Sequence, residues 1–244
     1  MDTLNIAGYR FVALEELVSL QGRIRAMCAA HGIRGTVLLA PEGINFFIAG
    51  PVPAIAAFRA LLESDSRLAG IDLKESRSAE IPFRRLKVRI KHEIIALGDP
   101  SINPASDPAP PLEPSRLKSW LDAGREVILL DTRNEFEVGV GAFEGAIHLG
   151  NTSFRAFGNA AKKLPIDAAG RAIVAYCTGG IRCEKAAPLL RKLGHREVYQ
   201  LRGGILGYFR EVGTDYYRGN CFVFDERVAL DAALEPEDQN PVQL

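Results

Sequence analysis

Cysteine and histidine are scarce in this sequence, and neither is spaced as a metal site or a disulfide framework. The 244 residues include four cysteines, at positions 28, 177, 183 and 221, and four histidines, at positions 31, 92, 148 and 195. Without a CxxC pair or a close cluster of histidines, no zinc ligand set is visible, and we expect no metal. Such scattered cysteines also exclude a secreted disulfide scaffold and favour a reducing compartment.

Long apolar runs and a targeting segment are missing as well. No stretch approaches the roughly 18 consecutive apolar residues of a membrane span, and residues 1–5 show no basic region leading into an apolar one. We therefore expect a soluble, cytoplasmic protein without a membrane partner. The formal net charge of +0 argues against a general nucleic-acid binder. However, residues 219–244 are acidic and the rest of the chain is mildly basic, which is compatible with an anionic macromolecular partner.

A proline-rich stretch divides the sequence. Residues 99–111 contain five prolines and almost no large apolar side chain, so they cannot form the interior of a helix or a sheet. We predict a first domain at 1–98, a linker at 99–111, a second domain at 112–218 and a short acidic tail at 219–244. Its composition predicts that this tail is largely disordered.

The hydrophobic periodicity predicts a different α/β arrangement for each domain. In the first domain, strands are predicted at 9–14, 36–40, 44–49, 72–76 and 86–97, and helices at 15–31 and 53–62. This βαββαβ order with an added strand predicts a ferredoxin-like (acylphosphatase-like) α+β sandwich. In the second domain, strands at 127–131, 146–149, 173–177 and 198–201 alternate with helices near 115–123, 153–163, 183–193 and 204–212. That alternation predicts an α/β domain with a mostly parallel sheet, whose chemistry lies at the carboxyl ends of its strands.

One such strand ends on Cys177 and is followed by a loop, an arginine and a helix. The loop consists of Thr178, Gly179, Gly180 and Ile181. Its glycines allow backbone N–H groups to turn toward the sulfur. The positive end of the helix, which is predicted to begin near Cys183, and the guanidinium of Arg182 are both expected to lower the pKa of Cys177. The pattern therefore predicts a nucleophilic thiolate, although a cysteine at this position can also be a small apolar filler.

Several neighbouring residues have two interpretations. Cys183 is either a resolving thiol for Cys177 or a core-facing residue of the first helical turn. Asp131, at the end of a strand, is expected to order nearby loops while Arg133 faces the same crevice, but the two also fit an ordinary structural ion pair. We interpret Cys28 and Cys221 as packing residues.

The first domain contains a strongly basic strand. Alternation places Leu86, Val88 and Ile90 on one face and cations on the other, and the cations are Arg85, Lys87, Arg89 and Lys91, preceded by Arg84. Successive cations lie about 6.6 Å apart and repel one another. The row therefore favours an anionic partner such as an RNA backbone; the alternative is a solvated edge strand that uses its charge against aggregation.

The Cys-Thr-Gly-Gly-Ile-Arg loop resembles the persulfide-carrying loop of rhodanese domains, as does Asp131-Thr132-Arg133 with Glu135 ahead of Gly145-Ala146-Ile147-His148. Cysteine phosphatases have one residue more between the same cysteine and arginine. The resemblance covers about residues 112–215. It implies a rhodanese-like domain in which Cys177 and Arg182 belong to the active site, while Asp131 and Arg133 support its shape.

Together with the segments Gly35–Asn45 and Pro82–Val88, this loop resembles the oxygen-dependent tRNA uridine hydroxylase family, over about residues 5–225. The resemblance implies hydroxylation of the wobble uridine to 5-hydroxyuridine, with molecular oxygen as co-substrate and no obvious metal or flavin. It also implies that Cys177 is catalytic and that the partner is the anticodon loop of tRNA rather than DNA. Longer members carry a cysteine-rich C-terminal extension, which is not seen here.

Two other functions stay open: sulfur transfer through a Cys177 persulfide, and non-catalytic RNA binding. For hydroxylation, the thiolate either adds to C6 of uridine or itself carries oxygen or sulfur. Tyr176, Phe154 and Phe157 are candidates for stacking on an extruded base. The oligomeric state and the way in which the domains meet do not follow from the sequence.

Overall fold

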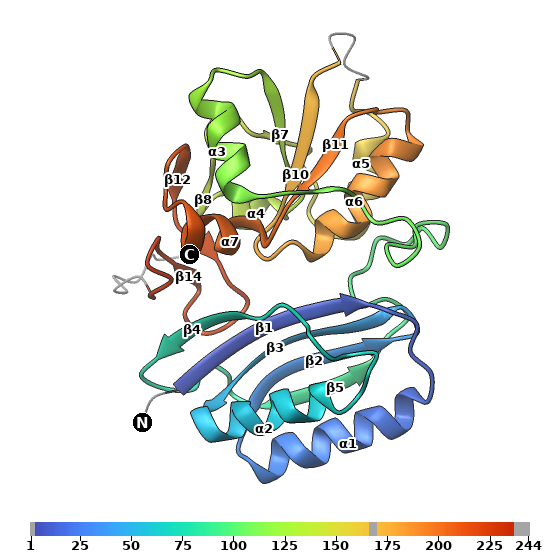
Figure 1. The fold of residues 1–244 in the computed structure, drawn as a ribbon, viewed down its shortest axis with the longest axis vertical. Coiled ribbons are helices and arrows are strands. Elements are labelled where there is room, and N and C mark those ends of the chain that lie inside the picture. Colours follow the sequence, from blue (N-terminus) through green and yellow to red (C-terminus); the bar gives the residue numbers. More distant parts are fainter. Residues whose placement is uncertain (1–2, 166–169, 237–244) are drawn as a thin grey trace.

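The computed structural model describes residues 3–165 and 170–236. Two α/β domains lie one on the other, and the sheet of the first domain separates its own helices from the second domain (Figure 1). No helix in the described ranges is long and apolar enough to cross a membrane.

The first domain is the predicted ferredoxin-like sandwich. Its elements are β1 (Thr3–Phe11), α1 (Leu17–Ala30), β2 (Arg34–Ala40), β3 (Gly43–Pro51), α2 (Val52–Glu63), β4 (Lys74–Ser78) and β5 (Leu86–Ile90). The sheet order is β4-β1-β3-β2-β5, with β5 parallel to β2 at one edge. Its hairpin between β2 and β3 turns at Pro41 and Glu42, because Ala40 pairs with Gly43. The predicted strand 86–97 is too long, since β5 ends at Ile90.

Alternation along the strands gives the sheet two unlike faces. On β3, Ile44, Phe46 and Ile48 are buried in one core with α1 and α2. The residues between them, Asn45 and Phe47, must point to the other face, toward the second domain. The apolar face therefore stabilises the domain, while the opposite face is available to build a site.

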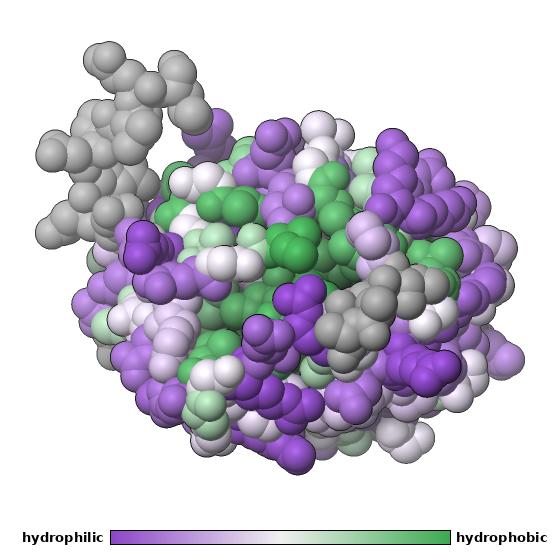
Figure 2. Space-filling model, turned by 90° about the horizontal axis from the view of Figure 1, so that it is seen from above, coloured by the Kyte–Doolittle hydropathy of each residue, from purple (hydrophilic) through white to green (hydrophobic). Residues whose placement is uncertain are grey.

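The second domain has the predicted parallel sheet. Its elements are β6 (Pro111–Leu112), α3 (Pro114–Asp122), β7 (Val127–Asp131), α4 (Glu135–Val138), β8 (Gly141–Phe143), β9 (Ile147–His148), α5 (Phe154–Ala161), β10 (Ala172–Tyr176), α6 (Ile181–Lys192), β11 (Val198–Leu201) and α7 (Gly204–Glu211). The five-stranded sheet has the order β6-β11-β10-β7-β9. Two cores, one containing residues of α5 and α6 and one containing residues of α3 and α7, enclose it. At the end of this domain farthest from the first, hydrophilic residues surround central apolar ones (Figure 2).

The linker and the tail both pack against folded parts. Ile102 and Ala109 are buried in a core of the second domain, and Arg191 on α6 is paired with Asp107 at 2.5 Å. The domain ranges stay a proposal; this packing supports grouping the linker with the second domain.

The prediction of a largely disordered tail is wrong for residues 219–236, while 237–244 lie outside the described residues. β12 (Tyr217–Gly219) pairs with β8, and β13 (Cys221–Phe222) pairs with β14 (Ala229–Leu230). The segment then reaches the first domain, where the Glu226 N–H donates to the Pro82 carbonyl (3.0 Å).

Candidate active site

Cys177 follows β10 at the carboxyl edge of the parallel sheet, shares a pocket with residues of the first domain, and is 1% exposed. Gly180 adopts a left-handed backbone (φ 100°), and α6 begins directly after it. In this conformation the Gly180 N–H donates to the Cys177 Sγ at 3.1 Å. The helix starts two residues before the predicted position, which brings its N-terminal amides to the sulfur.

A second glycine fixes the loop from the side of α7. At Gly204 (φ 61°), an added Cβ would lie 2.3 Å from the Cys177 carbonyl oxygen. This close approach lets the Ile205 N–H donate to that oxygen at 2.9 Å, and the Leu206 N–H donate to the Thr178 oxygen at 3.0 Å. By contrast, an added Cβ on Gly179 would meet nothing within 4 Å, so this residue faces open space in front of the sulfur.

The surroundings favour a thiolate on Cys177 and a thiol on Cys183. Burial raises the pKa of Cys177, but the hydrogen bond from Cys183, the charge of Arg182, and the amides of Arg182 and Gly180 together lower it to about 6. Burial, followed by the neighbouring Cys177, raises the pKa of Cys183 well above its ordinary value. Cys183 is fully buried with Ala175 and Cys177. It therefore faces the core, in agreement with one of its two interpretations, and donates to the thiolate.

Arg182 is held by a carboxylate that the sequence analysis missed. Its guanidinium donates two hydrogen bonds of 2.7 Å to Glu137 of α4, and both side chains are buried. At the start of α4, the Glu137 carboxylate also accepts a hydrogen bond from the Asn134 backbone N–H at 3.0 Å. This Asn-x-x-Glu spacing is a sequence signal for a helix start, but it gives no indication of the pairing with Arg182.

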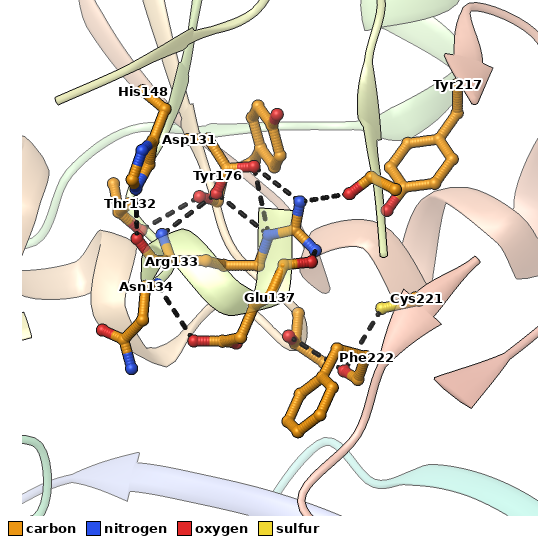
Figure 3. A network of polar contacts seen from close by, with 12 residues as sticks. Asp131, Thr132, Arg133, Asn134, Glu137, His148, Tyr176, Tyr217, Cys221 and Phe222 are labelled. Atoms are coloured by element: carbon orange, nitrogen blue, oxygen red, sulfur yellow. Dashed lines mark hydrogen bonds and ion pairs between the residues drawn. The ribbon is translucent and has the colours of Figure 1, made fainter. Parts of the chain in front are cut away.

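Asp131 and Arg133 form a buried ion pair (Figure 3). The Arg133 guanidinium donates to the Asp131 carboxylate at 2.9 and 2.6 Å, and also to the carbonyl oxygens of Glu137 and Gly141. Arg133 is 0% exposed, so the expectation that it faces the crevice is wrong. The pair fits the structural interpretation, because it holds the backbone that carries Glu137.

The pocket in front of Cys177 lies between the domains. The first domain contributes Tyr9, Asn45 and Phe47 to its lining, and the second contributes the loop from Cys177 to Gly179 with Ile181 and Arg182. The Tyr9 hydroxyl donates to Glu184 of α6 at 3.1 Å. These first-domain residues were missed, although strand alternation already separates them from the core. Among the described residues, no group of three His, Cys, Asp or Glu side chains is placed to hold a metal ion.

The aromatic residues that were predicted to stack on a substrate base do not line the pocket at Cys177. Tyr176 and Phe157 are 0% exposed and Phe154 is 6% exposed, and all three belong to the cores of the second domain. The expectation that one of them stacks on a substrate base is therefore wrong. Strand and helix periodicity placed these rings in their elements but did not distinguish a core position from a pocket position.

A buried lysine joins the active-site helix to the first domain. Lys185 of α6 donates to Glu42 at 2.9 Å, to Glu93 at 2.7 Å and to the Ile95 carbonyl at 3.0 Å. Glu42 lies in the turn of the hairpin between β2 and β3. Because an unpaired buried charge is costly, this cluster favours a fixed position of α6 against the hairpin.

The basic strand β5 shares a sheet face with the pocket. Lys87 is in register with Thr36, which pairs with Phe47, and Arg89 is in register with Leu38, which pairs with Asn45. Val88 is buried on the other face, as predicted. Within the described ranges, the structure shows no acidic partner for the four cations of the row, Arg85, Lys87, Arg89 and Lys91. The preceding Arg84 is paired with Glu226 at 2.8 Å.

Comparison with known proteins supports both domains. The UPF0176 acylphosphatase like domain matches residues 3–94, and the Rhodanese-like domain matches residues 113–211. A Cupriavidus taiwanensis protein named tRNA uridine(34) hydroxylase is 49% identical over 97% of this chain and 86% of its own length. A protein of the same name from Bordetella avium is 48% identical over 97% of this chain and 100% of its own length. A solved rhodanese-like domain from Anabaena is 22% identical over 55% of this chain and 90% of that chain, with a TM-score of 0.39.

Proposed function

This chain belongs to the tRNA uridine(34) hydroxylase family, and we propose that it is an oxidoreductase that converts the wobble uridine of tRNA to 5-hydroxyuridine, with Cys177 as the catalytic nucleophile. The observation that carries the assignment of Cys177 is its position at a pocket between the domains, with the Gly180 N–H on its sulfur. Amides that are fixed in this way stabilise negative charge without reorganisation.

The thiolate is suited to covalent activation of the pyrimidine. Attack of the Cys177 sulfur on C6 forms an S–C6 bond, and the electron pair of the C5–C6 double bond moves toward C5 and O4. C5 then bonds to one oxygen atom derived from molecular oxygen. Loss of the C5 proton and departure of the thiolate restore the double bond. Cleavage of the O–O bond and reduction of the second oxygen atom to water take two electrons and two protons, which two external thiols supply as they become a disulfide.

Burial of the sulfur is consistent with a base that leaves its stack. Because Cys177 is 1% exposed, the reacting base has to enter the pocket, which a nucleotide of a single-stranded loop does at a smaller unstacking cost than a paired one. We propose that the anticodon loop of tRNA presents this base, and that Tyr9, Asn45 and Phe47 cradle it. The free cysteines of the chain support the cytoplasm as the compartment.

The test is nucleoside analysis of tRNA from a deletion strain that expresses the wild-type protein or a variant. We expect Cys177→Ala to lower 5-hydroxyuridine formation by at least about a thousandfold. Cys28→Ala is the matched control, because Cys28 is equally buried but lies in the core of the first domain. Oxygen gas labelled with a heavy isotope should mark the new hydroxyl group. Full 5-hydroxyuridine formation by Cys177→Ala would contradict the assignment.

A further inference from the structure

We propose that Phe224, with Phe222 and Phe136, forms a stacking platform for bases that flank the target uridine, opposite the cations of β5. This inference rests on the proposed function, because it takes the anticodon loop as the occupant. It assigns a role to the segment after Arg218, where the sequence analysis expected only an acidic tail.

The three phenylalanines form a continuous track that leads away from the pocket. The centroids of the Phe136 and Phe222 rings are 5.2 Å apart, and those of Phe222 and Phe224 are 5.1 Å apart. The centroid of the Phe224 ring also lies 6.5 Å from that of Phe47, and both residues line the pocket at Cys177. The track therefore runs from the reacting sulfur across the second domain to α4.

The track is exposed where packing alone would bury it. Phe136 is 54% exposed and Phe224 is 48% exposed, and they are the two aromatic residues among the large hydrophobic side chains that the described residues expose. Burying a phenylalanine stabilises a fold by about 1.5–3 kcal/mol. Two exposed rings that are joined through Phe222 and leave much of this stabilisation unused indicate a surface that another molecule covers.

The wall opposite the track carries the positive charge. Arg85, Lys87 and Thr36 line one groove together with Phe222 and Phe224. Two acids also line it, and each is paired, Asp225 with Arg227 and Glu226 with Arg84. In the described ranges, Arg85 and Lys87 have no acidic partner, so their charge is available to phosphates.

A cationic wall that faces aromatic rings is the arrangement that binds single-stranded nucleic acid. Phenylalanine has no hydrogen-bonding group, so it stacks on any base without reading its identity. The platform would therefore hold the nucleotides beside the target uridine while the Cys177 pocket selects the uridine itself. A protein partner is disfavoured, because the cations would need matching carboxylates in the middle of its interface.

Binding of an anticodon stem-loop RNA tests the platform. The RNA carries 2-aminopurine next to the target uridine, and the protein carries Cys177→Ala so that no turnover occurs. We expect Phe224→Ala to weaken binding by about tenfold and to abolish the fluorescence change that reports stacking. Phe224→Leu keeps an apolar side chain but should also lose this signal, whereas Phe224→Trp should retain it. Val18→Ala, at an exposed apolar position on α1, is the control.

Wild-type affinity and an unchanged fluorescence signal in Phe224→Ala would overturn the platform. A shift of Phe224→Ala in oligomeric state with no loss of RNA binding would also overturn it, in favour of a protein contact. Failure of the proposed function would be seen separately, as 5-hydroxyuridine formation by Cys177→Ala. An unchanged midpoint of thermal unfolding confirms that each variant is folded.

Discussion

The two charged regions that flank the pocket are built in opposite ways. Around Cys177, Arg182 is buried and paired with Glu137, and Arg133 is buried and paired with Asp131. On β5 the cations lie at a sheet edge and, within the described ranges, lack acidic partners. Buried charges are tolerated only when they are paired, and the pairing fixes geometry. Exposed cations cost little and stay available for phosphate. Under the proposed function, the chemistry takes place where atoms are fixed, and RNA binds where charge is accessible.

Removal of one buried partner should have the largest effect. Glu137→Ala leaves the Arg182 guanidinium buried without its carboxylate, so we expect the free energy of unfolding to fall by about 3–5 kcal/mol. Urea unfolding measures this change. Glu144→Ala is the control, because Glu144 forms an exposed pair with Arg218 at 2.7 Å and should contribute less than about 1 kcal/mol. If the free energy of unfolding fell equally in the two variants, the buried pair would be no more important for stability than an exposed one.

The sequence predicted the parts of this site that depend on local pattern. Periodicity identified both domains, and glycine and helix-start chemistry identified the loop at Cys177. Glu137 and Lys185 were missed because their roles depend on partners that are distant in the chain, Arg182 and Glu42. The errors at Arg133 and in the tail have a related cause. Asp131, the partner of Arg133, is only two residues away, but local composition does not indicate whether the rest of the fold buries a charged side chain or packs against an acidic segment.

The buried surroundings of Cys177 should also determine how the rate of hydroxylation depends on pH. A pKa of about 6 for Cys177 means that the thiolate predominates above this pH and is lost below it. At pH 5, we expect the rate of hydroxylation to be about tenfold lower than its plateau. Cys183→Ala removes a hydrogen-bond donor to the thiolate, so the midpoint should move to higher pH. The ultraviolet absorbance of the thiolate measures the titration directly.

Cys28→Ala should leave this midpoint unchanged, because burial raises the pKa of Cys28 to about 12 and the residue lies in the other domain. A midpoint in the range of a free thiol would contradict the role assigned to the amides and to Arg182. A midpoint that does not respond to Cys183→Ala would contradict only the hydrogen bond between the two cysteines.

Neutralising single cations of β5 should have the smallest effect of these substitutions. It tests the exposed one of the two charged regions. Lys87→Gln and Arg89→Gln should each weaken tRNA binding only a few-fold and lower the salt dependence of affinity by about one phosphate contact. Neither should change the stability or the titration of Cys177. Arg23→Gln, on the helix that covers the opposite sheet face, should leave the salt dependence unchanged. If Arg23→Gln lowers the salt dependence equally, the affinity for tRNA depends on the total charge of the protein and not on the sheet face that carries Lys87 and Arg89.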